Sequence, residues 1–238
     1  MSQKKSGAMA VFVKTPGYSP VKTRLAASLG VKAAESFHLA SAYSVAAIMQ
    51  ASSRLMGVQC FFAIAEKAAF HSPLWKSMPH LYQGGGNLGQ RMYKIYTELV
   101  KEYGFAILLG ADAPQIDMHD LNTATQWISH TQSNRFSMGP AMDGGFWLFG
   151  GNQILPESLW TEVEYSQSNT GKEFRSRVEV FGALQILRSL TDVDSIKDLP
   201  GVLSDMKALT NPQMEQNQLV SQLEKWSPDL FLHKEALS

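Results

Sequence analysis

Short apolar segments alternate with longer amphipathic segments along this chain, and this alternation restricts the fold more than any other feature. The short segments are rich in Val, Ile and Phe and are bounded by Gly, Pro or charged residues, which is typical of buried β-strands. They are residues 8–13, 58–65, 105–109, 146–149 and 184–187.

Helical patterns fill the intervals between these segments. Residues 32–55 are rich in Ala with apolar residues three and four positions apart, and residues 88–102 carry a continuous apolar face. A third helix is predicted over residues 117–130, with Asp117 as its N-cap and Asp120 three positions later. The repeated order of strand and helix predicts an α/β fold with three α/β/α layers, in which helices cover both faces of a largely parallel sheet.

The length and the charge of the chain limit its class. Its 238 residues predict one α/β domain over residues 1–199 and a C-terminal helical appendage over residues 200–238, for which a dimer contact or a lid is the alternative. The 21 Lys+Arg balance 21 Asp+Glu, so the basic surplus that binders of nucleic acid or anionic membranes need is missing. Residues 1–119 nevertheless hold 12 basic and 6 acidic residues, and residues 120–238 hold 9 and 15. A site where a basic segment meets an acidic one is therefore compatible with the neutral total.

The single cysteine bears on the cellular compartment. Cys60 lies in an apolar run, which predicts a buried core residue rather than a nucleophile. One cysteine cannot form an internal disulfide, which is typical of a reducing compartment, so we expect a cytoplasmic protein. No apolar stretch approaches the roughly 18 residues of a transmembrane helix. The apolar run before Lys14 is also too short for the core of a signal peptide.

The first candidate site follows the predicted strand 8–13, because ligands of open parallel sheets bind beyond the carboxyl ends of strands. After Lys14, two prolines and a glycine predict a turn, and Pro20 is suited to the start of a helix. Lys22 and Arg24 then lie near the helix N-terminus, where free amides and the helix dipole favour an anion. This predicts a phosphate site, with solvated surface cations as the alternative. Neither a P-loop nor a G-x-G-x-x-G sequence is present.

Two aspartates border later predicted strands. Asp112 directly follows the third strand, where a carboxylate suits Mg²⁺ or Mn²⁺, although a simple turn-forming role is the alternative. Asp143 precedes Gly144 and Gly145 and then an aromatic strand. A hairpin turn without chemistry is the alternative, because Asp-Gly is a strong turn signal by itself. Two glycines, however, let a ligand approach the backbone closely, and Phe146 is placed to form the wall of a pocket.

Two further segments have the composition of ligand-binding loops. Three consecutive glycines open the predicted helix 88–102, in the sequence QGGGNLGQR from Gln83 to Arg91. Such a loop lies flat against a base or sugar, or brings backbone amides to phosphate. The sequence TDVDSIKD contains Asp192 and Asp194, which are candidates for further metal ligands. It lacks the Gly and Glu of a calcium loop, and the chain lacks zinc-site histidine spacing and a G-x-S-x-G motif.

Five sequences, taken in order, resemble the DUF2064 family of bacterial glycosyltransferase-like proteins. They are KTP…VKTRLA, QGGGNLGQRM, LLGADAP, GPAMDGGFWLFGG and TDVDSIKDL, which lie within residues 8–199. That family looks like part of the nucleotide-diphospho-sugar transferase superfamily, whose members include molybdenum-cofactor and phospholactate guanylyltransferases. The resemblance implies a GT-A-type, Rossmann-like fold with a mixed, mostly parallel sheet.

The resemblance also implies roles for individual residues. The nucleotide-binding residues would be Lys14, Lys22, Thr23, Arg24, Gln83, Gly85, Gly86, Asn87 and Arg91. The Mg²⁺ or Mn²⁺ ligands would be Asp112 together with Asp192 or Asp194. The acceptor or sugar would lie beside Asp143, Gly144, Gly145 and Phe146. Of all these, Asp143 and Lys22 are the residues expected to act in catalysis.

Several positions depart from the family pattern. Asn87 and Gln90 stand where acids are expected in the glycine loop, and Phe146 stands for a tyrosine. Ala111 and Ala113 replace the hydroxyl residues that flank the metal aspartate. These departures leave the identity of the acceptor open.

The sequence as a whole predicts a metal-dependent transferase that uses a nucleotide sugar or a nucleoside triphosphate and an unknown acceptor. In this hypothesis Lys22 and Arg24 neutralise phosphates, while Asp112 and a second aspartate hold the metal. Glycosyl transfer is preferred on the resemblance, and nucleotidyl transfer of the guanylyltransferase type is the alternative. A nucleotide-binding protein of the same fold that has lost turnover is the rival from another class.

Overall fold

The centre of the molecule is a seven-stranded sheet with the order β3-β2-β1-β4-β6-β5-β7. The computed structural model describes residues 6–129 and 131–235, with only the backbone described for residues 227–235. Neighbouring strands from β3 to β4 are parallel, β6 is antiparallel to both β4 and β5, and β7 is parallel to β5. The strands are β1 (Ala8–Val13), β2 (Gln59–Ile64), β3 (His80–Tyr82), β4 (Ala106–Gly110), β5 (Arg135–Pro140), β6 (Phe146–Gly151) and β7 (Ala183–Ile186). The predicted mixed, mostly parallel sheet is confirmed.

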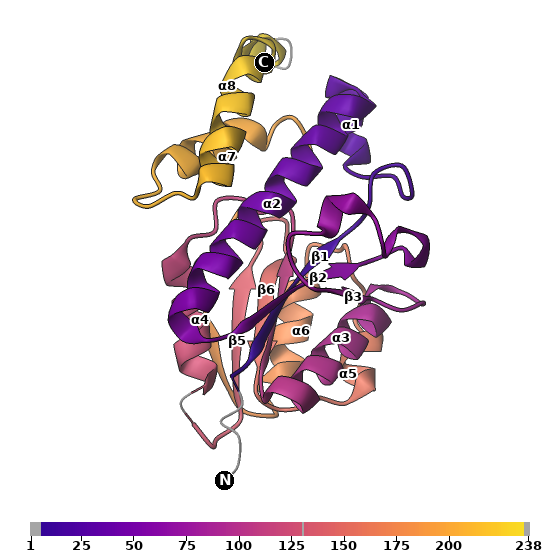
Figure 1. Ribbon diagram of the computed structural model, residues 1–238, viewed down its shortest axis with the longest axis vertical. Coiled ribbons are helices and arrows are strands. Elements are labelled where there is room, and N and C mark those ends of the chain that lie inside the picture. Colours follow the sequence, from indigo (N-terminus) through magenta and orange to yellow (C-terminus); the bar gives the residue numbers. More distant parts are fainter. Residues whose placement is uncertain (1–5, 130, 236–238) are drawn as a thin grey trace.

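Helices cover both faces of this sheet, as Figure 1 shows. They are α1 (Thr23–Leu29), α2 (Val31–Met56), α3 (Leu88–Tyr103), α4 (Met118–Ser129), α5 (Glu157–Thr161), α6 (Thr170–Val178), α7 (Leu199–Lys207) and α8 (Met214–Glu235). Side chains alternate along β1, so Met9 and Val11 join the core under α2 and α4, whereas Ala8 and Ala10 join the core under α3, α5 and α6. This is the predicted α/β/α layering. Among the described residues, no helix combines the length and apolarity needed to cross a membrane.

The local predictions and the observed elements agree where the sequence pattern is strong. The predicted strand 8–13 is β1, and the other four predicted strands overlap β2, β4, β6 and β7. The predicted helix 117–130 is α4, although residue 130 lies outside the described residues. Asp120 N donates to Asp117 Oδ1 over 2.9 Å and Asp117 N to Asp120 Oδ2 over 3.1 Å, which confirms Asp117 as the N-cap.

Two strands escaped the sequence analysis. β3 has only three residues and lies at an edge of the sheet, so it offers little hydrophobic pattern to detect. β5, with the sequence RFSMGP, contains a glycine and a proline, which argue against a strand when no partner is known. β5 is nevertheless paired on both sides, by β6 and β7. Pairing with distant segments therefore formed a strand that local composition disfavours.

The C-terminal region forms the helices α7 and α8, of which α8 packs against α2 and α7 packs against α8 (Figure 1). Their apolar side chains share one cluster with side chains of α1 and of the first half of α2. Its members include Leu25, Phe37, Leu203, Leu219 and Leu223. Helices were expected in this part of the chain, whereas the domain boundary at residue 199 stays a prediction. The shared cluster means that the position of α1 depends on α7 and α8.

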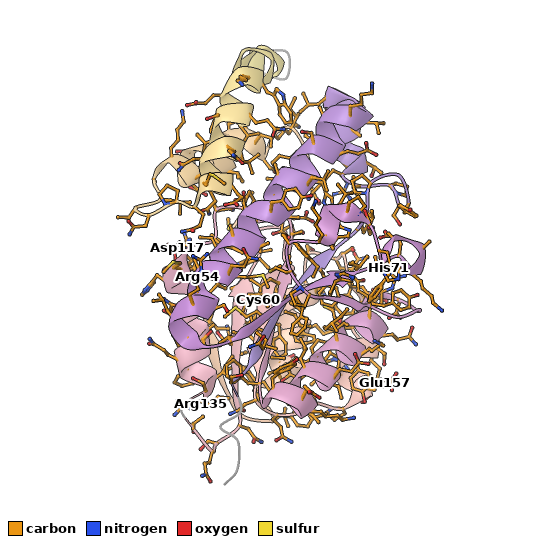
Figure 2. All side chains as sticks on the ribbon, in the orientation of Figure 1. Arg54, Cys60, His71, Asp117, Arg135 and Glu157 are labelled. Carbon is orange, nitrogen blue, oxygen red and sulfur yellow. The ribbon has the colours of Figure 1, made fainter. Side chains whose placement is uncertain are left out.

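Cys60, labelled in Figure 2, lies on β2, the second strand from one edge of the sheet. It is a buried free thiol that donates to the carbonyl oxygen of Met49 over 3.4 Å. Burial raises the pKa of the Cys60 thiol to about 11, so the reactive thiolate is disfavoured at neutral pH. The prediction of a core residue is confirmed.

Candidate active site

The carboxyl ends of β1 and β4 bring the predicted phosphate and metal residues together. The two strands are parallel neighbours, so the loops that follow them emerge at the same edge of the sheet. The loop after β1 carries Lys22 and the loop after β4 carries Asp112, and the distance from Lys22 Nζ to Asp112 Oδ1 is 2.9 Å. The Lys22 side chain is only 5% exposed. Its ammonium group is therefore buried in an ion pair with the predicted metal ligand.

A third segment, after β7, completes this cluster. The backbone N–H of Val193 donates to the carbonyl oxygen of Asp112 over 3.1 Å, and Lys22 Nζ donates to the carbonyl oxygen of Val193. Lys22 Nζ also lies 3.9 Å from Asp194 Oδ1, while Arg24 Nη1 donates to Asp194 Oδ2 over 3.2 Å. The basic first loop thus meets the acidic segment from the second half of the chain.

The backbone at Lys22 is unusual. Lys22 is the N-cap of α1 and has φ 47° and ψ 48°, in the left-handed region that non-glycine residues rarely adopt. Such conformations cost of order 1–3 kcal/mol and persist where the surroundings enforce them. Here the surroundings are Asp112 and the carbonyl oxygen of Val193, which hold the ammonium group inward. Arg24, whose side chain is 78% exposed, is the more accessible cation of the first loop.

Asp192 shows that carboxylates crowd this edge. Burial raises the pKa of Asp192 to about 7. The negative charges of Asp112, Asp143 and Asp194 also raise this pKa, whereas the positive charge of Lys22 lowers it. Asp192 is therefore close enough to both the Asp112 loop and the Asp143 turn to sense their charges. An additional cation among these groups would relieve the repulsion between them.

His38 is a member of the site that the sequence analysis missed. It is buried on α2, with Nε2 2.8 Å from the carbonyl oxygen of Lys14 and Nδ1 3.9 Å from Asp112 Oδ1. Burial lowers the pKa of His38, which favours the neutral ring. Because a carbonyl oxygen only accepts, the proton lies on Nε2, and the Nδ1 lone pair faces Asp112. A histidine within an Ala-rich helix carries no sequence signal for this contact.

The carboxylates fit a metal that arrives with a nucleotide. Asp112 Oδ1 is buried, and its contact with Lys22 Nζ at 2.9 Å is an ion pair without hydrogen-bond geometry. No group of three His, Cys, Asp or Glu in the described part of the chain is arranged to hold a metal by itself. Mg²⁺, however, is usually held by one or two carboxylates together with substrate phosphates and water. Asp112 and Asp192 have the carboxylate chemistry for such a shared site, in which Lys22 pairs with Asp112 and Arg24 pairs with Asp194.

The glycine loop is fixed at both ends. Gln83 is buried, and its Nε2 donates to the carbonyl oxygen of Ala63 over 2.8 Å and to that of Val13 over 3.4 Å. At the other end, Gln90 N donates to Asn87 Oδ1 over 3.0 Å and Asn87 N donates to Gln90 Oε1 over 2.9 Å. The two amides that replace the expected acids thus form a capping box, which requires only side-chain acceptors.

The remaining predicted nucleotide contacts lie on the surface around this loop. Arg91 Nε donates to the carbonyl oxygen of Gly86 over 3.0 Å and so folds back across the loop. The exposed members of the predicted set are Lys14, Thr23, Arg24, Gly85, Gly86 and Asn87. Their exposure leaves them accessible to a ligand, and their contact with a nucleotide stays a prediction.

The Asp143 turn packs against the start of α6. Gly145 N donates to Asp143 Oδ1 over 2.9 Å, and Asp143 itself is exposed. Gly144 has φ +93°, and a Cβ there would lie 1.9 Å from the carbonyl oxygen of Ser168, so only glycine fits. Phe146 packs on Phe174 with ring centroids 5.0 Å apart and joins the core under α6. The turn connects β5 and β6 as a hairpin, and its predicted contact with an acceptor stays a prediction.

Known proteins share this architecture. The family described as "Uncharacterized protein conserved in bacteria (DUF2064)" matches residues 45–167, just over half of the chain. A structure from Desulfovibrio desulfuricans G20, provisionally named a nucleotide-diphospho-sugar transferase, has a TM-score of 0.80 at 19% identity, covering 94% of this chain and 96% of that one. A cytidylyltransferase from Leptospira borgpetersenii serovar Hardjo-bovis has a TM-score of 0.50 at 13% identity, with 94% and 96% covered.

A further solved structure, 4-diphosphocytidyl-2C-methyl-D-erythritol synthase from Anaerococcus prevotii DSM 20548, has a TM-score of 0.51 at 7% identity and covers 85% of this chain and 97% of that one. No curated protein matches the chain. At these identities the likeness establishes the fold, which is that of the nucleotide-diphospho-sugar transferases.

Proposed function

We propose that this chain, which belongs to the bacterial protein family DUF2064, is a metal-dependent transferase acting on a nucleotide sugar or a nucleoside triphosphate. The observation that carries the proposal is the convergence of Lys22, Asp112 and Asp192 where β1 and β4 end. This edge is where open α/β sheets bind their ligands. The Asp112 carboxylate, which pairs with Lys22 and lies near further acids, has the chemistry to accept a divalent cation.

The residues have separable roles in this proposal. Asp112 and Asp192 would hold Mg²⁺ or Mn²⁺, which supplies positive charge to stabilise the leaving pyrophosphate or nucleoside diphosphate. Lys22, through its 2.9 Å contact, holds the Asp112 carboxylate in place and lowers the local negative charge. Arg24 lies at the exposed end of the same network and is placed to attract phosphates. Positioning and electrostatics would then provide most of the rate enhancement.

Two transfer reactions fit this arrangement. In glycosyl transfer the acceptor attacks the anomeric carbon and a nucleoside diphosphate leaves, whereas in nucleotidyl transfer the acceptor attacks the α-phosphorus and pyrophosphate leaves. The family resemblance favours glycosyl transfer. The second candidate is supported by the two neighbouring structures whose names describe cytidylyl chemistry. The product released on turnover distinguishes the two reactions.

Loss of turnover is the rival explanation for the departures from the family pattern. The structure removes part of its motivation, because Asn87 and Gln90 keep the glycine loop capped as acids would. Ala113 is fully buried in the core under α2 and α4, so its methyl group is accommodated by packing. Asn87, Gln90 and Ala113 are therefore each accommodated within their loops.

A thermal-shift screen of nucleoside triphosphates and nucleotide sugars, with and without Mn²⁺, tests the proposal. We expect at least one nucleotide to raise the Tm in the presence of Mn²⁺ and D112N to lose this response, because Asp112 is the main ligand. Asp205, which is exposed on α7, provides the matched control, and D205N should respond like the wild type. A full Mn²⁺-dependent shift in D112N would contradict the assignment of Asp112. Analysis of the released phosphate species then selects the reaction.

A further inference from the structure

Every backbone carbonyl of the loop that carries Asp112, residues 111–116, accepts a hydrogen bond. The six hydrogen bonds come from five donors: Ser41 Oγ to Ala111 (2.5 Å), Val193 N to Asp112 (3.1 Å), Ile116 N to Ala113 (3.3 Å), Arg188 Nη2 to Gln115 (3.1 Å), and Gln216 Nε2 to both Pro114 (2.8 Å) and Ile116 (2.9 Å). Only one of these bonds is local to the loop. The loop is therefore held from outside, by α2, by the segment after β7 and by α8.

Gln216 differs from the other donors because it serves two carbonyls at once. It lies on α8, about a hundred positions from the loop, and its side chain is fully buried. Its Oε1 accepts from the backbone N–H of Gln213 over 2.9 Å, which fixes which end of the amide faces the loop. Both amide hydrogens are then used on the carbonyls of Pro114 and Ile116. The Nε2 group therefore has no hydrogen left to donate elsewhere.

The two carbonyls flank the turn that follows Asp112. Pro114 cannot donate a backbone hydrogen bond, so the turn depends on its acceptors for attachment to the rest of the fold. Without Gln216, the two buried carbonyls of Pro114 and Ile116 would have no donor, and the turn would move toward water to satisfy them. Movement there displaces Asp112, which is two residues from Pro114. A ligand carboxylate tolerates little displacement before metal binding weakens.

We propose that Gln216 is a positioning residue for Asp112, so that the C-terminal helix α8 sets the geometry of the metal and nucleotide site. The proposal rests on the proposed function, because it assigns Asp112 to that site. It gives α8 a role beyond covering the apolar side chains of α1 and α2. Through Gln216, α8 anchors the loop that carries Asp112. The segment that carries Asp192 is anchored by Val193, whose side chain lies in the same apolar cluster as Leu219 of α8.

The experiment must distinguish the effect of the Gln216 hydrogen bonds on the Asp112 loop from a general weakening of the packing of α8. Q216M keeps the size of the side chain and removes all three hydrogen bonds. Q216E keeps the acceptor for Gln213 N but loses both donors to the loop. Leu219 is fully buried on the same helix and belongs to the apolar cluster, so L219A provides a control that weakens the packing of α8 while keeping the Gln216 side chain and its hydrogen-bonding groups.

Two measurements on the full chain are compared among these variants. Hydrogen exchange followed by mass spectrometry reports the protection of the amides in residues 110–117 without any ligand. Isothermal titration with CTP in the presence of Mn²⁺, and with Mn²⁺ alone, reports binding. We expect about tenfold faster exchange in this segment and about tenfold weaker Mn²⁺-dependent nucleotide binding in Q216M and Q216E than in L219A.

The outcomes separate the two proposals. If residues 110–117 exchange in Q216M and Q216E as they do in L219A, Gln216 does not hold the loop and the inference is wrong. If the exchange is faster but Mn²⁺-dependent binding equals that of L219A, the loop is held without positioning Asp112, which also overturns it. If the wild type itself binds neither Mn²⁺ nor any nucleotide of the screen, the proposed function fails, and the positioning role that depends on it fails with it.

Discussion

The two loops at the carboxyl edge of the sheet are stabilised in opposite ways. The glycine loop after β3 is shaped largely by neighbours in sequence, through the capping box of Asn87 and Gln90. The loop 111–116 after β4 is held almost entirely by residues far away, including Arg188 and Gln216. A local device can be recognised from a few consecutive residues. A loop held from several distant segments cannot, because its partners are adjacent only after folding.

This difference predicts that removing a distant residue that holds the Asp112 loop costs more free energy of unfolding than changing a residue within the glycine loop. The largest effect is expected at Arg188, whose guanidinium donates to both carboxylate oxygens of Asp120 and to the carbonyl of Gln115. The Asp120 side chain is 4% exposed, so R188M leaves a buried charge without its partner. We expect a loss of about 3 kcal/mol in the free energy of unfolding, measured by urea denaturation.

The control for Arg188 is Arg175, an arginine whose acidic partner is exposed. Arg175 pairs with Glu179 over 2.8 Å on the surface of α6, with both side chains about half exposed. Exposed pairs of this kind contribute little, so R175M should cost less than about 0.5 kcal/mol. Equal losses in R188M and R175M would contradict the distant-support explanation.

The next effect concerns pH. The folded-state pKa of Asp192 is about 7 and its ordinary value is 3.8, so between these values the folded protein binds a proton that the unfolded chain does not. Stability therefore falls as the pH rises from about 4 to 7. D192N stays neutral, so its free energy of unfolding relative to the wild type should rise by about 2 kcal/mol across this window, allowing for partial solvent access. Urea titrations at several pH values measure the difference, and a flat difference would contradict the burial of this carboxyl group.

A third test addresses the glycine loop itself. Gly86 has φ +88°, and a Cβ there would lie 2.1 Å from Gln90 Oε1, so G86A strains the backbone and displaces the capping side chain. We expect a loss of about 1.5 kcal/mol in urea denaturation. At the adjacent Gly85 the backbone is unstrained and a Cβ meets nothing within 4 Å, so G85A should be neutral or slightly stabilising. A loss in G85A as large as in G86A would show that the capping box does not define the loop.

The smallest effects are expected at Asn87. N87A removes the acceptor for the Gln90 N–H and should cost about 1 kcal/mol of unfolding free energy. N87D restores the acid that the family pattern leads one to expect, keeps the acceptor, and should change stability by less than about 0.5 kcal/mol. Thermal unfolding of the two variants compares them directly. If N87D were as destabilising as N87A, the loop would need the amide for a reason other than capping.

Elements whose signal is contained in short segments could be predicted from the sequence. β1 and the N-cap of α4 at Asp117 were predicted because apolar runs and capping residues act over a few positions. The strand ends also predicted that Lys22 and Asp112 lie at one edge of the sheet, since strands of a parallel sheet end at a common edge, and the two side chains are in contact there. The sequence did not predict that Lys22 is buried against Asp112, or that His38 faces the same carboxylate, because these contacts depend on how α1 and α2 pack.

The sequence by itself determined five of the strands and the helices α2, α3 and α4, together with the class of the fold and the loops in which chemistry is to be sought. Hydrophobic periodicity and capping are local properties, so they can be recognised in the sequence without knowing which distant residues pack against them. The tertiary structure alone decided how the Asp112 loop is held and what the polar C-terminal region contributes. The Gln/Asn-rich stretch after residue 200 offers little pattern, yet its Gln216 completes the hydrogen bonding of that loop. The physical reason is that a buried carbonyl needs a donor, and any distant part of the chain can supply it.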